Sequence, residues 1–177
     1  MNGSLFRFAL AVFFFATLPG CGKEVPDPCK LVTIEEVRSI APEVAHSKAV
    51  DSVAFKTLES PAAGASVKTC VWRNASDVDQ VLLTSKAAAD PDGTLEAQLK
   101  RLLGANSARV VAVPSIGQDA AAAFYGSGNS EIMAIIVAQN GQVYLELRPI
   151  GIAFGEKSPE FAATTALMKT AFDRSKQ

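Results

Sequence analysis

The sequence predicts an α+β fold, in which a mostly antiparallel sheet carries about three helices packed on it within a single domain, residues 29–177. Three observations lead to this expectation. Strand-like segments come in groups separated by single helices, instead of alternating with helices one by one. Asn140-Gly141 stands between two apolar segments and is typical of a tight β-hairpin. No shift in composition divides the segment into two parts.

The first helix is expected to run from Thr33 to about Ile40. Thr33 and Glu36 have the spacing of a capping box, in which each side chain accepts a hydrogen bond from the backbone N–H of the other residue. Pro42 ends the helix, because the residue directly before a proline is disfavoured in the helical conformation.

Two or three strands are expected next, then a second helix, four more strands and a final helix. Alternation along the segment 66–73 places Lys68, Cys70 and Trp72 on one face. The expected strands are residues 53–58, 66–73, 80–86, 109–113, 120–125, 131–138 and 142–149.

The second helix is expected from Asp90 to near Gly104, because its leucines recur at helical spacing and a glycine suits the position after a helix. The last helix begins at Ser158-Pro159, with serine as the cap and proline in the first turn. One face of it carries Phe161, Thr165, Met168 and Phe172.

The composition excludes several classes of function. Lys plus Arg number 17 and Asp plus Glu number 18, so the chain lacks the positive charge that nucleic-acid binding needs. One histidine and three cysteines leave little material for a metal site. We expect no metal, no cofactor and no nucleic-acid partner.

Residues 1–20 are expected to be a lipoprotein signal peptide. The apolar segment Phe8–Leu18 is too short to span a bilayer, which takes about 20 residues, but it suits the core of an export signal. It ends in Leu18-Pro19-Gly20-Cys21, which resembles a bacterial lipobox. That resemblance implies cleavage after Gly20 and diacylglycerol on the Cys21 sulfur.

Acylation would anchor the protein without a spanning helix, since each buried methylene contributes about 0.8 kcal/mol. Cys21 is therefore the expected lipidation site, on the extracytoplasmic face of the cell membrane or outer membrane. Gly22 after the cysteine resembles the outer-membrane sorting pattern. The alternative is an ordinary cleaved signal peptide with Cys21 as a disulfide partner or free thiol.

Residues 21–28 are expected to be the lipidated cysteine and a tether. Gly22–Pro28 contains two prolines and polar residues and can extend to at most about 25 Å. The domain would therefore stay close to the bilayer, where an envelope protein or a small ligand is its natural partner.

Cys29 and Cys70 remain once Cys21 is lipidated. In an exported chain two remaining cysteines usually pair, and we favour a structural disulfide. The alternatives are a redox-active pair or a thiolate nucleophile. Neither cysteine lies in a Cys-x-x-Cys motif, and Cys70 stands among apolar strand residues, which disfavours the thiolate.

Three motifs together resemble a family of small secreted bacterial lipoproteins of unknown function, best represented in actinobacteria. They are Asp27-Pro28-Cys29-Lys30-Leu31, Cys70-Val71-Trp72, and the segment 113–120, which contains Gly117 and Ala120. The resemblance covers nearly the whole mature domain. It implies a Cys29–Cys70 disulfide and an extracytoplasmic α+β domain, and it transfers no catalytic residue.

No set of residues predicts catalysis. His46 is the only imidazole and is expected in a surface loop, because no Gly-x-Ser-x-Gly motif supplies a nucleophile. We therefore expect a non-catalytic, lipid-anchored binding or accessory protein of the cell envelope. The alternatives are an inhibitor or immunity-type lipoprotein, and an envelope hydrolase that would use the carboxylates Asp119, Glu131 or Glu146.

Overall fold

An antiparallel sheet of seven strands lies at the centre of the computed structural model, which describes residues 24–51, 66–87, 94–103, 108–117, 119–126 and 132–177. The strands are β1 (Val44–Asp51), β2 (Val67–Asn74), β3 (Asp79–Ala87), β4 (Arg109–Ala112), β5 (Asp119–Tyr125), β6 (Ile132–Gln139) and β7 (Val143–Pro149). The helices in this part of the chain are α1 (Pro28–Leu31), α2 (Ile34–Val37), α3 (Leu95–Leu103) and α4 (Pro159–Arg174).

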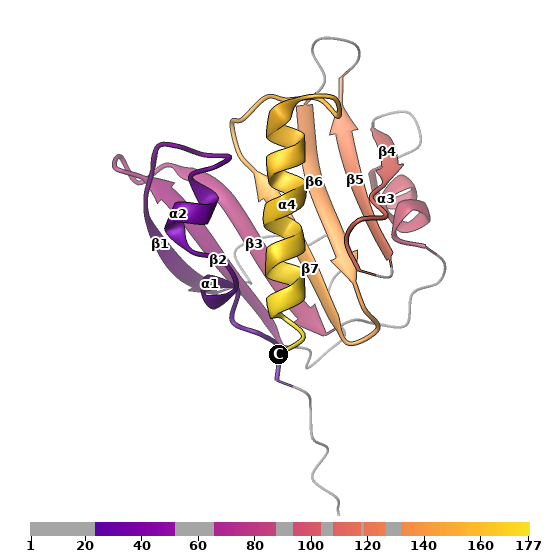
Figure 1. Ribbon diagram of the computed structural model, residues 1–177, viewed down its shortest axis with the longest axis horizontal. Coiled ribbons are helices and arrows are strands. Elements are labelled where there is room, and N and C mark those ends of the chain that lie inside the picture. The colour runs from indigo at the N-terminus through magenta and orange to yellow at the C-terminus, as the bar shows by residue number, and fades with distance from the viewer. Residues whose placement is uncertain (1–23, 52–65, 88–93, 104–107, 118, 127–131) are drawn as a thin grey trace, which may run out of the picture.

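Two meanders make up the sheet, whose strand order is β1-β2-β3-β7-β6-β5-β4 (Figure 1). The first meander contains β1 to β3 and the second β4 to β7. They join where β3 pairs with β7, with Leu83 opposite Leu147. All six strand pairs are antiparallel, so the predicted α+β class and the antiparallel sheet are confirmed.

Helices cover both faces of the sheet. In Figure 1, α4 lies in front of β6 and β7, with α1 and α2 beside it over the first meander, whereas α3 packs on β4 and β5 from the other side. The core under α4 contains Trp72, Leu83 and Phe172, and the smaller core under α3 contains Leu99 and Ile135.

Strand β5 shows why both faces must be covered. Its four alanines, 120–123, are buried and alternate between the two cores. Alanine is a poor strand former, but its small side chain lets a helix approach the sheet closely on either side. Tertiary packing therefore decides the conformation of this segment.

Gly117, just before β5, permits close packing of α4. Its φ is +62°, and a Cβ atom there would lie 2.4 Å from the ring of Phe172. A glycine is required on both grounds, since L residues with side chains rarely adopt that φ and the ring is fully buried.

Local signals act as predicted at the starts of α2 and α4 and at the β6–β7 turn. Ser158 caps α4, Thr33 and Glu36 form the capping box of α2, and the turn at Asn140-Gly141 joins β6 to β7, with φ +76° at the glycine. The expected strand at 53–58 lies outside the described residues, as does Asp90, where the second helix was expected to begin.

Three elements differ from the prediction. The described residues hold four helices where about three were expected, because Pro28–Leu31 forms a separate turn capped by Asp27. Helix α2 ends at Val37, short of Ile40. His46 was expected in a loop but lies in β1, which the sequence analysis missed because residues 45–49 are all exposed.

Candidate functional site

The segment Glu24–Pro28, expected to be part of a tether, lies against the end of the sheet. Lys68 of β2 donates a hydrogen bond from Nζ to the carbonyl oxygen of Val25 at 2.7 Å, and Ser85 of β3 donates from Oγ to that of Pro26 at 2.5 Å. Val25 is only 3% exposed. The two donors fix an extended, proline-containing segment that has no strand partner of its own.

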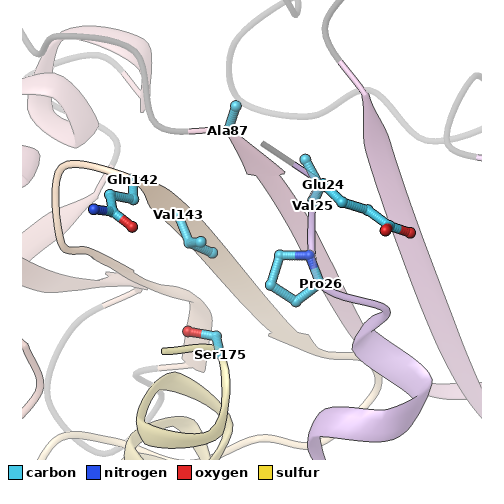
Figure 2. Close-up of a pocket in the computed structure, with 7 residues that line it drawn as sticks. All are labelled: Glu24, Val25, Pro26, Ala87, Gln142, Val143 and Ser175. Atoms are coloured by element: carbon cyan, nitrogen blue, oxygen red, sulfur yellow. The ribbon is translucent and has the colours of Figure 1, made fainter. Parts of the chain in front are cut away.

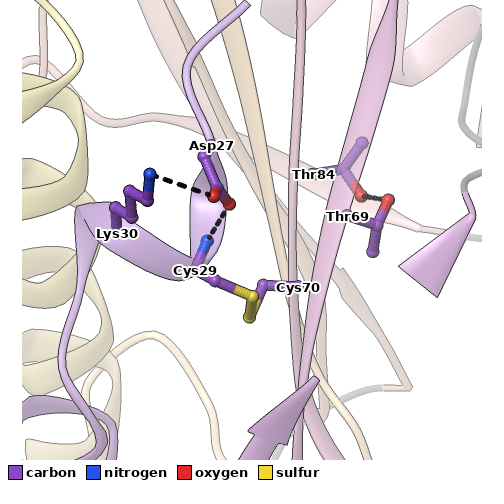
Figure 3. The surroundings of a disulfide bond; sticks show 6 residues. All are labelled: Asp27, Cys29, Lys30, Thr69, Cys70 and Thr84. Carbon is purple, nitrogen blue, oxygen red and sulfur yellow. Dashed lines mark hydrogen bonds and ion pairs between the residues drawn. A yellow bond between two sulfur atoms is a disulfide. The ribbon is translucent and has the colours of Figure 1, made fainter. Parts of the chain in front are cut away.

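The same segment runs directly into a covalent cross-link. Asp27 accepts a hydrogen bond from the backbone N–H of Cys29 at 3.0 Å and so caps α1. Cys29 forms a disulfide with Cys70, and their Cα atoms lie 5.1 Å apart (Figure 3). The expected disulfide is confirmed. Cys70 is fully buried in the core that contains Trp72, which suits a structural cross-link.

A small pocket lies between this segment and the C-terminal end of α4. Its volume is about 110 Å³, well below the ~300 Å³ at which ligand pockets of ordinary size begin. Figure 2 shows its lining residues, which come from the N-terminal segment, β3, the β6–β7 turn, β7 and the residue after α4: Glu24, Val25, Pro26, Ala87, Gln142, Val143 and Ser175. We call this part of the molecule the Glu24 end.

An open groove of about 340 Å³ separates α2 from α4. Its lining on the α4 side consists of Ala163, Ala166, Leu167 and Thr170. On the other side it is lined by Glu36 and Ser39. Arg174 donates hydrogen bonds to both carboxylate oxygens of Glu36, at 2.8 and 2.7 Å. That contact lowers the pKa of Glu36, so its carboxylate stays charged and engaged.

His46 pairs with a carboxylate on the β2–β3 turn. Its Nε2 lies 3.0 Å from Oδ1 of Asp77, whose φ of +63° turns the chain sharply at this point. The hydrogen bond with His46 lowers the pKa of Asp77. Within the described ranges, no three His, Cys, Asp or Glu side chains are grouped so as to hold a metal ion.

The two described carboxylates considered for hydrolysis, Asp119 and Glu146, both accept hydrogen bonds from neighbouring residues. Oδ2 of Asp119 accepts hydrogen bonds from the backbone N–H of Leu95, at the start of α3, and from Nε2 of Gln139. Glu146 is 2% exposed on β7 and accepts a hydrogen bond from Nε of Arg148 at 2.5 Å. Glu131 lies outside the described residues.

The large exposed apolar side chains lie at the ends of the strands opposite Glu24. The large apolar side chains that are exposed in the described part of the chain are Val78, Tyr125, Ile132 and Ile150. Tyr125 and Ile132 pair across β5 and β6, and the N–H of Ile150 donates to the carbonyl oxygen of Gln80, two residues after Val78. We call this the far end.

Sequence reasoning missed the docking of Glu24–Pro28. One signal was present in the strand alternation, which places Lys68 on the same face as two core residues, Cys70 and Trp72. A lysine in that position needs an acceptor, and the carbonyl oxygen of Val25 supplies it. The role of Ser85 depends on tertiary packing alone, because nothing in its local sequence marks it.

Comparison with known proteins gives no match: no family model, no curated protein and no solved structure matches this chain. The resemblance to small actinobacterial lipoproteins stays a prediction from the residues. None of the described helices is both long enough and apolar enough to cross a membrane.

Proposed function

We propose that the protein is a non-catalytic, lipid-anchored binding or accessory protein on the extracytoplasmic side of the bacterial cell envelope. The signal peptide of residues 1–20 is removed and Cys21 carries the lipid. The observation that carries this proposal is the Cys29–Cys70 disulfide. It suits an oxidising compartment outside the cytosol, and of the three cysteines it leaves Cys21, next to the lipobox residues, for acylation.

The carboxylates support a binding role over hydrolysis. Asp119 accepts the N–H at the start of α3, and Glu146 is buried and paired with Arg148. A glycosidase needs two carboxyl groups across a substrate cleft, with one available as the acid. Asp119 and Glu146 instead hold secondary structure and other side chains in place.

The placement of apolar residues supports a protein partner. Val78, Ile132 and Ile150 are exposed at the far end, while the Glu24 end presents polar residues such as Gln142 and Ser175. Large apolar side chains exposed at one end of a domain and not at the other favour a contact surface at the first. The far end is therefore the surface on which an envelope protein would bind.

The Cys21→Ser variant tests the anchor. We expect the native protein to partition into the detergent phase and its N-terminal peptide to carry a diacylglycerol mass. The C21S variant should lose both properties, and the double variant Cys29→Ala/Cys70→Ala, which lacks only the disulfide, should keep them. A bare sulfur at position 21 in the native protein, or C21S protein retained in the membrane, would refute the proposal.

A photo-crosslinking amino acid at Val78, Ile132 or Ile150 tests the partner surface. We expect each of the three positions to give the same cross-linked envelope protein in intact cells. The matched control is Lys100, which is exposed on α3 and distant in sequence from all three. Adducts from Lys100 equal to those from the far end, or none from any far-end position, would contradict the assignment.

A further inference from the structure

The short distance along the chain between Cys21 and Glu24 limits how the domain can sit on a membrane. Only Gly22 and Lys23 stand between these residues. Three residue steps cover at most about 11 Å, whatever their conformation. A lipid on Cys21 therefore brings Glu24 to within that distance of the acylated residue.

Because Glu24–Pro28 is docked on the sheet, the short distance between Cys21 and Glu24 also limits the position of the whole domain relative to the lipid. Lys68 and Ser85 hold the carbonyl oxygens of Val25 and Pro26, and the disulfide fixes Cys29 to β2. A free segment of seven residues, as the sequence suggested, would let the domain tumble. A segment that is docked from Glu24 onward makes the Glu24 end the side nearest the anchor.

The chemistry of the Glu24 end fits the headgroup layer of a bilayer. Ala87, Gln142 and Ser175 lie there, beside the exposed carboxylate of Glu24. Lys176 follows Ser175 and is paired with Asp173, so positive and negative groups are both present. The described residues of this surface suit contact with zwitterionic and hydrated headgroups.

The lengths of α4 and of the strands determine how far the far end lies from the Glu24 end. Helix α4 has 16 residues and runs toward the Glu24 end. At 1.5 Å per residue its length is about 24 Å. The far end, with Val78 and Ile132, lies at the opposite ends of the strands, so it is separated from the Glu24 end by about the same distance.

From these relationships we infer that the domain stands upright on the membrane, with the Glu24 end against phospholipid headgroups and the far end directed away from them. This inference rests on the proposed acylation of Cys21. Beyond the proposed function, it identifies the surface that contacts lipid and the surface that remains open to a partner.

Fluorescence energy transfer to an acceptor lipid tests the orientation. Gln142→Cys and Ser76→Cys form a matched pair of label sites, because both are exposed hairpin positions whose N–H donates to an asparagine side chain two residues earlier. Each labelled protein is purified with its lipid and reconstituted in phosphatidylcholine vesicles containing the acceptor. We expect transfer to be several-fold stronger from position 142 than from position 76.

An insertion provides the control for the short link. Eight Gly/Ser residues placed between Gly22 and Lys23 change none of the described residues, yet they lengthen the link by up to about 28 Å. The contrast between the two labels should then shrink. Lys68→Met/Ser85→Ala, which releases the docked segment, should act in the same direction, whereas Lys48→Met/Ser47→Ala on exposed β1 should leave the contrast unchanged.

The outcomes separate the two proposals. Acylated protein with equal transfer from both labels, or with stronger transfer from position 76, overturns the orientation and leaves the anchor intact. A contrast that survives the insertion also overturns it, because the short link would then not be its cause. A bare sulfur at position 21 overturns the proposed function and the orientation together.

Discussion

Arg174, the last residue of α4, binds Glu36 of α2 across 138 residues of sequence. Its Nη1 and Nη2 atoms donate to the two carboxylate oxygens at 2.8 and 2.7 Å, and Nη1 also donates to the carbonyl oxygen of Leu31. Because Glu36 also accepts the N–H of Thr33, one carboxylate closes the cap of α2 and joins α2 to α4.

The first prediction concerns pH. The Arg174 guanidinium holds the pKa of Glu36 below its ordinary value of 4.5. Such a carboxylate stabilises the fold above its unfolded-state pKa, and this stabilisation is lost as the pH falls through the lower folded-state pKa. The urea concentration at the unfolding midpoint should therefore decrease as the pH is lowered through the ordinary glutamate pKa of 4.5 and below it.

Glu36→Gln should lower the urea midpoint at neutral pH and make its acid dependence shallower. Part of the slope should remain, because the pKa values of Asp77 and Asp173 are lowered as well, by hydrogen bonds with His46 and Lys169. Glu35→Gln, at the exposed neighbouring position, should keep the native slope. Parallel pH profiles for the native and Glu36→Gln proteins would show that the Arg174 contact contributes nothing.

The second prediction concerns the disulfide. Cys29 and Cys70 are 41 residues apart, and loop-closure entropy for that separation corresponds to about 4 kcal/mol. Cys29→Ala/Cys70→Ala should lose free energy of unfolding of about that size, measured by urea denaturation. The native protein unfolded with a reductant present should show a similar loss. A double variant as stable as the oxidised protein would show that removing the disulfide adds little conformational entropy to the unfolded chain.

The third prediction concerns Gly117. Gly117→Ala should destabilise the fold by about 2–4 kcal/mol, since it adds a clash with Phe172 to an unfavourable positive φ. Gly151→Ala is the matched control, because Gly151 has a φ of +71° with nothing near its Cβ position, and it should cost only about 1–2 kcal/mol. Equal losses of stability in the Gly117→Ala and Gly151→Ala variants would show that α4 can move away from an added Cβ atom at no cost. Adding Phe172→Leu to Gly117→Ala should recover part of the difference.

The fourth prediction separates a structural from a catalytic role for Asp119. Asp119→Ala should cost about 1–2 kcal/mol, because the N–H of Leu95 and the amide of Gln139 lose their acceptor. Hydrogen exchange should accelerate first in α3. Glu43→Ala, at an exposed position, should change neither quantity. Unchanged hydrogen exchange in α3 would show that Asp119 does not stabilise the start of this helix.

Local chemistry explains which elements the sequence predicts well. Ser158-Pro159 begins α4 as expected, and Asn140-Gly141 forms the hairpin turn, because each signal acts within a few residues. The pairing of β3 with β7 could not be predicted, since it joins segments about 60 residues apart that no local pattern connects.

Strand β1 and the docked segment Glu24–Pro28 show what could not be predicted from the sequence near the candidate site. Residues 45–49 are all exposed, so β1 lacks the alternation by which a strand is recognised. The segment Glu24–Pro28 has the composition of a linker, and its position depends on Lys68 and Ser85, which lie more than 40 residues further along. Cys29 and Cys70 were predictable because few cysteines leave few pairings.

The disulfide also determines where mechanical load travels. A pull on the N-terminus passes through Val25 and Pro28 to Cys29 and crosses to Cys70 of β2 through the sulfur atoms. Tension therefore passes through only the first turn of α1 and bypasses α2 and β1, and some 40 residues, about 140 Å of chain at full stretch, cannot be drawn out. The force enters next to the middle of the first meander, where β2 is held by strands on both sides.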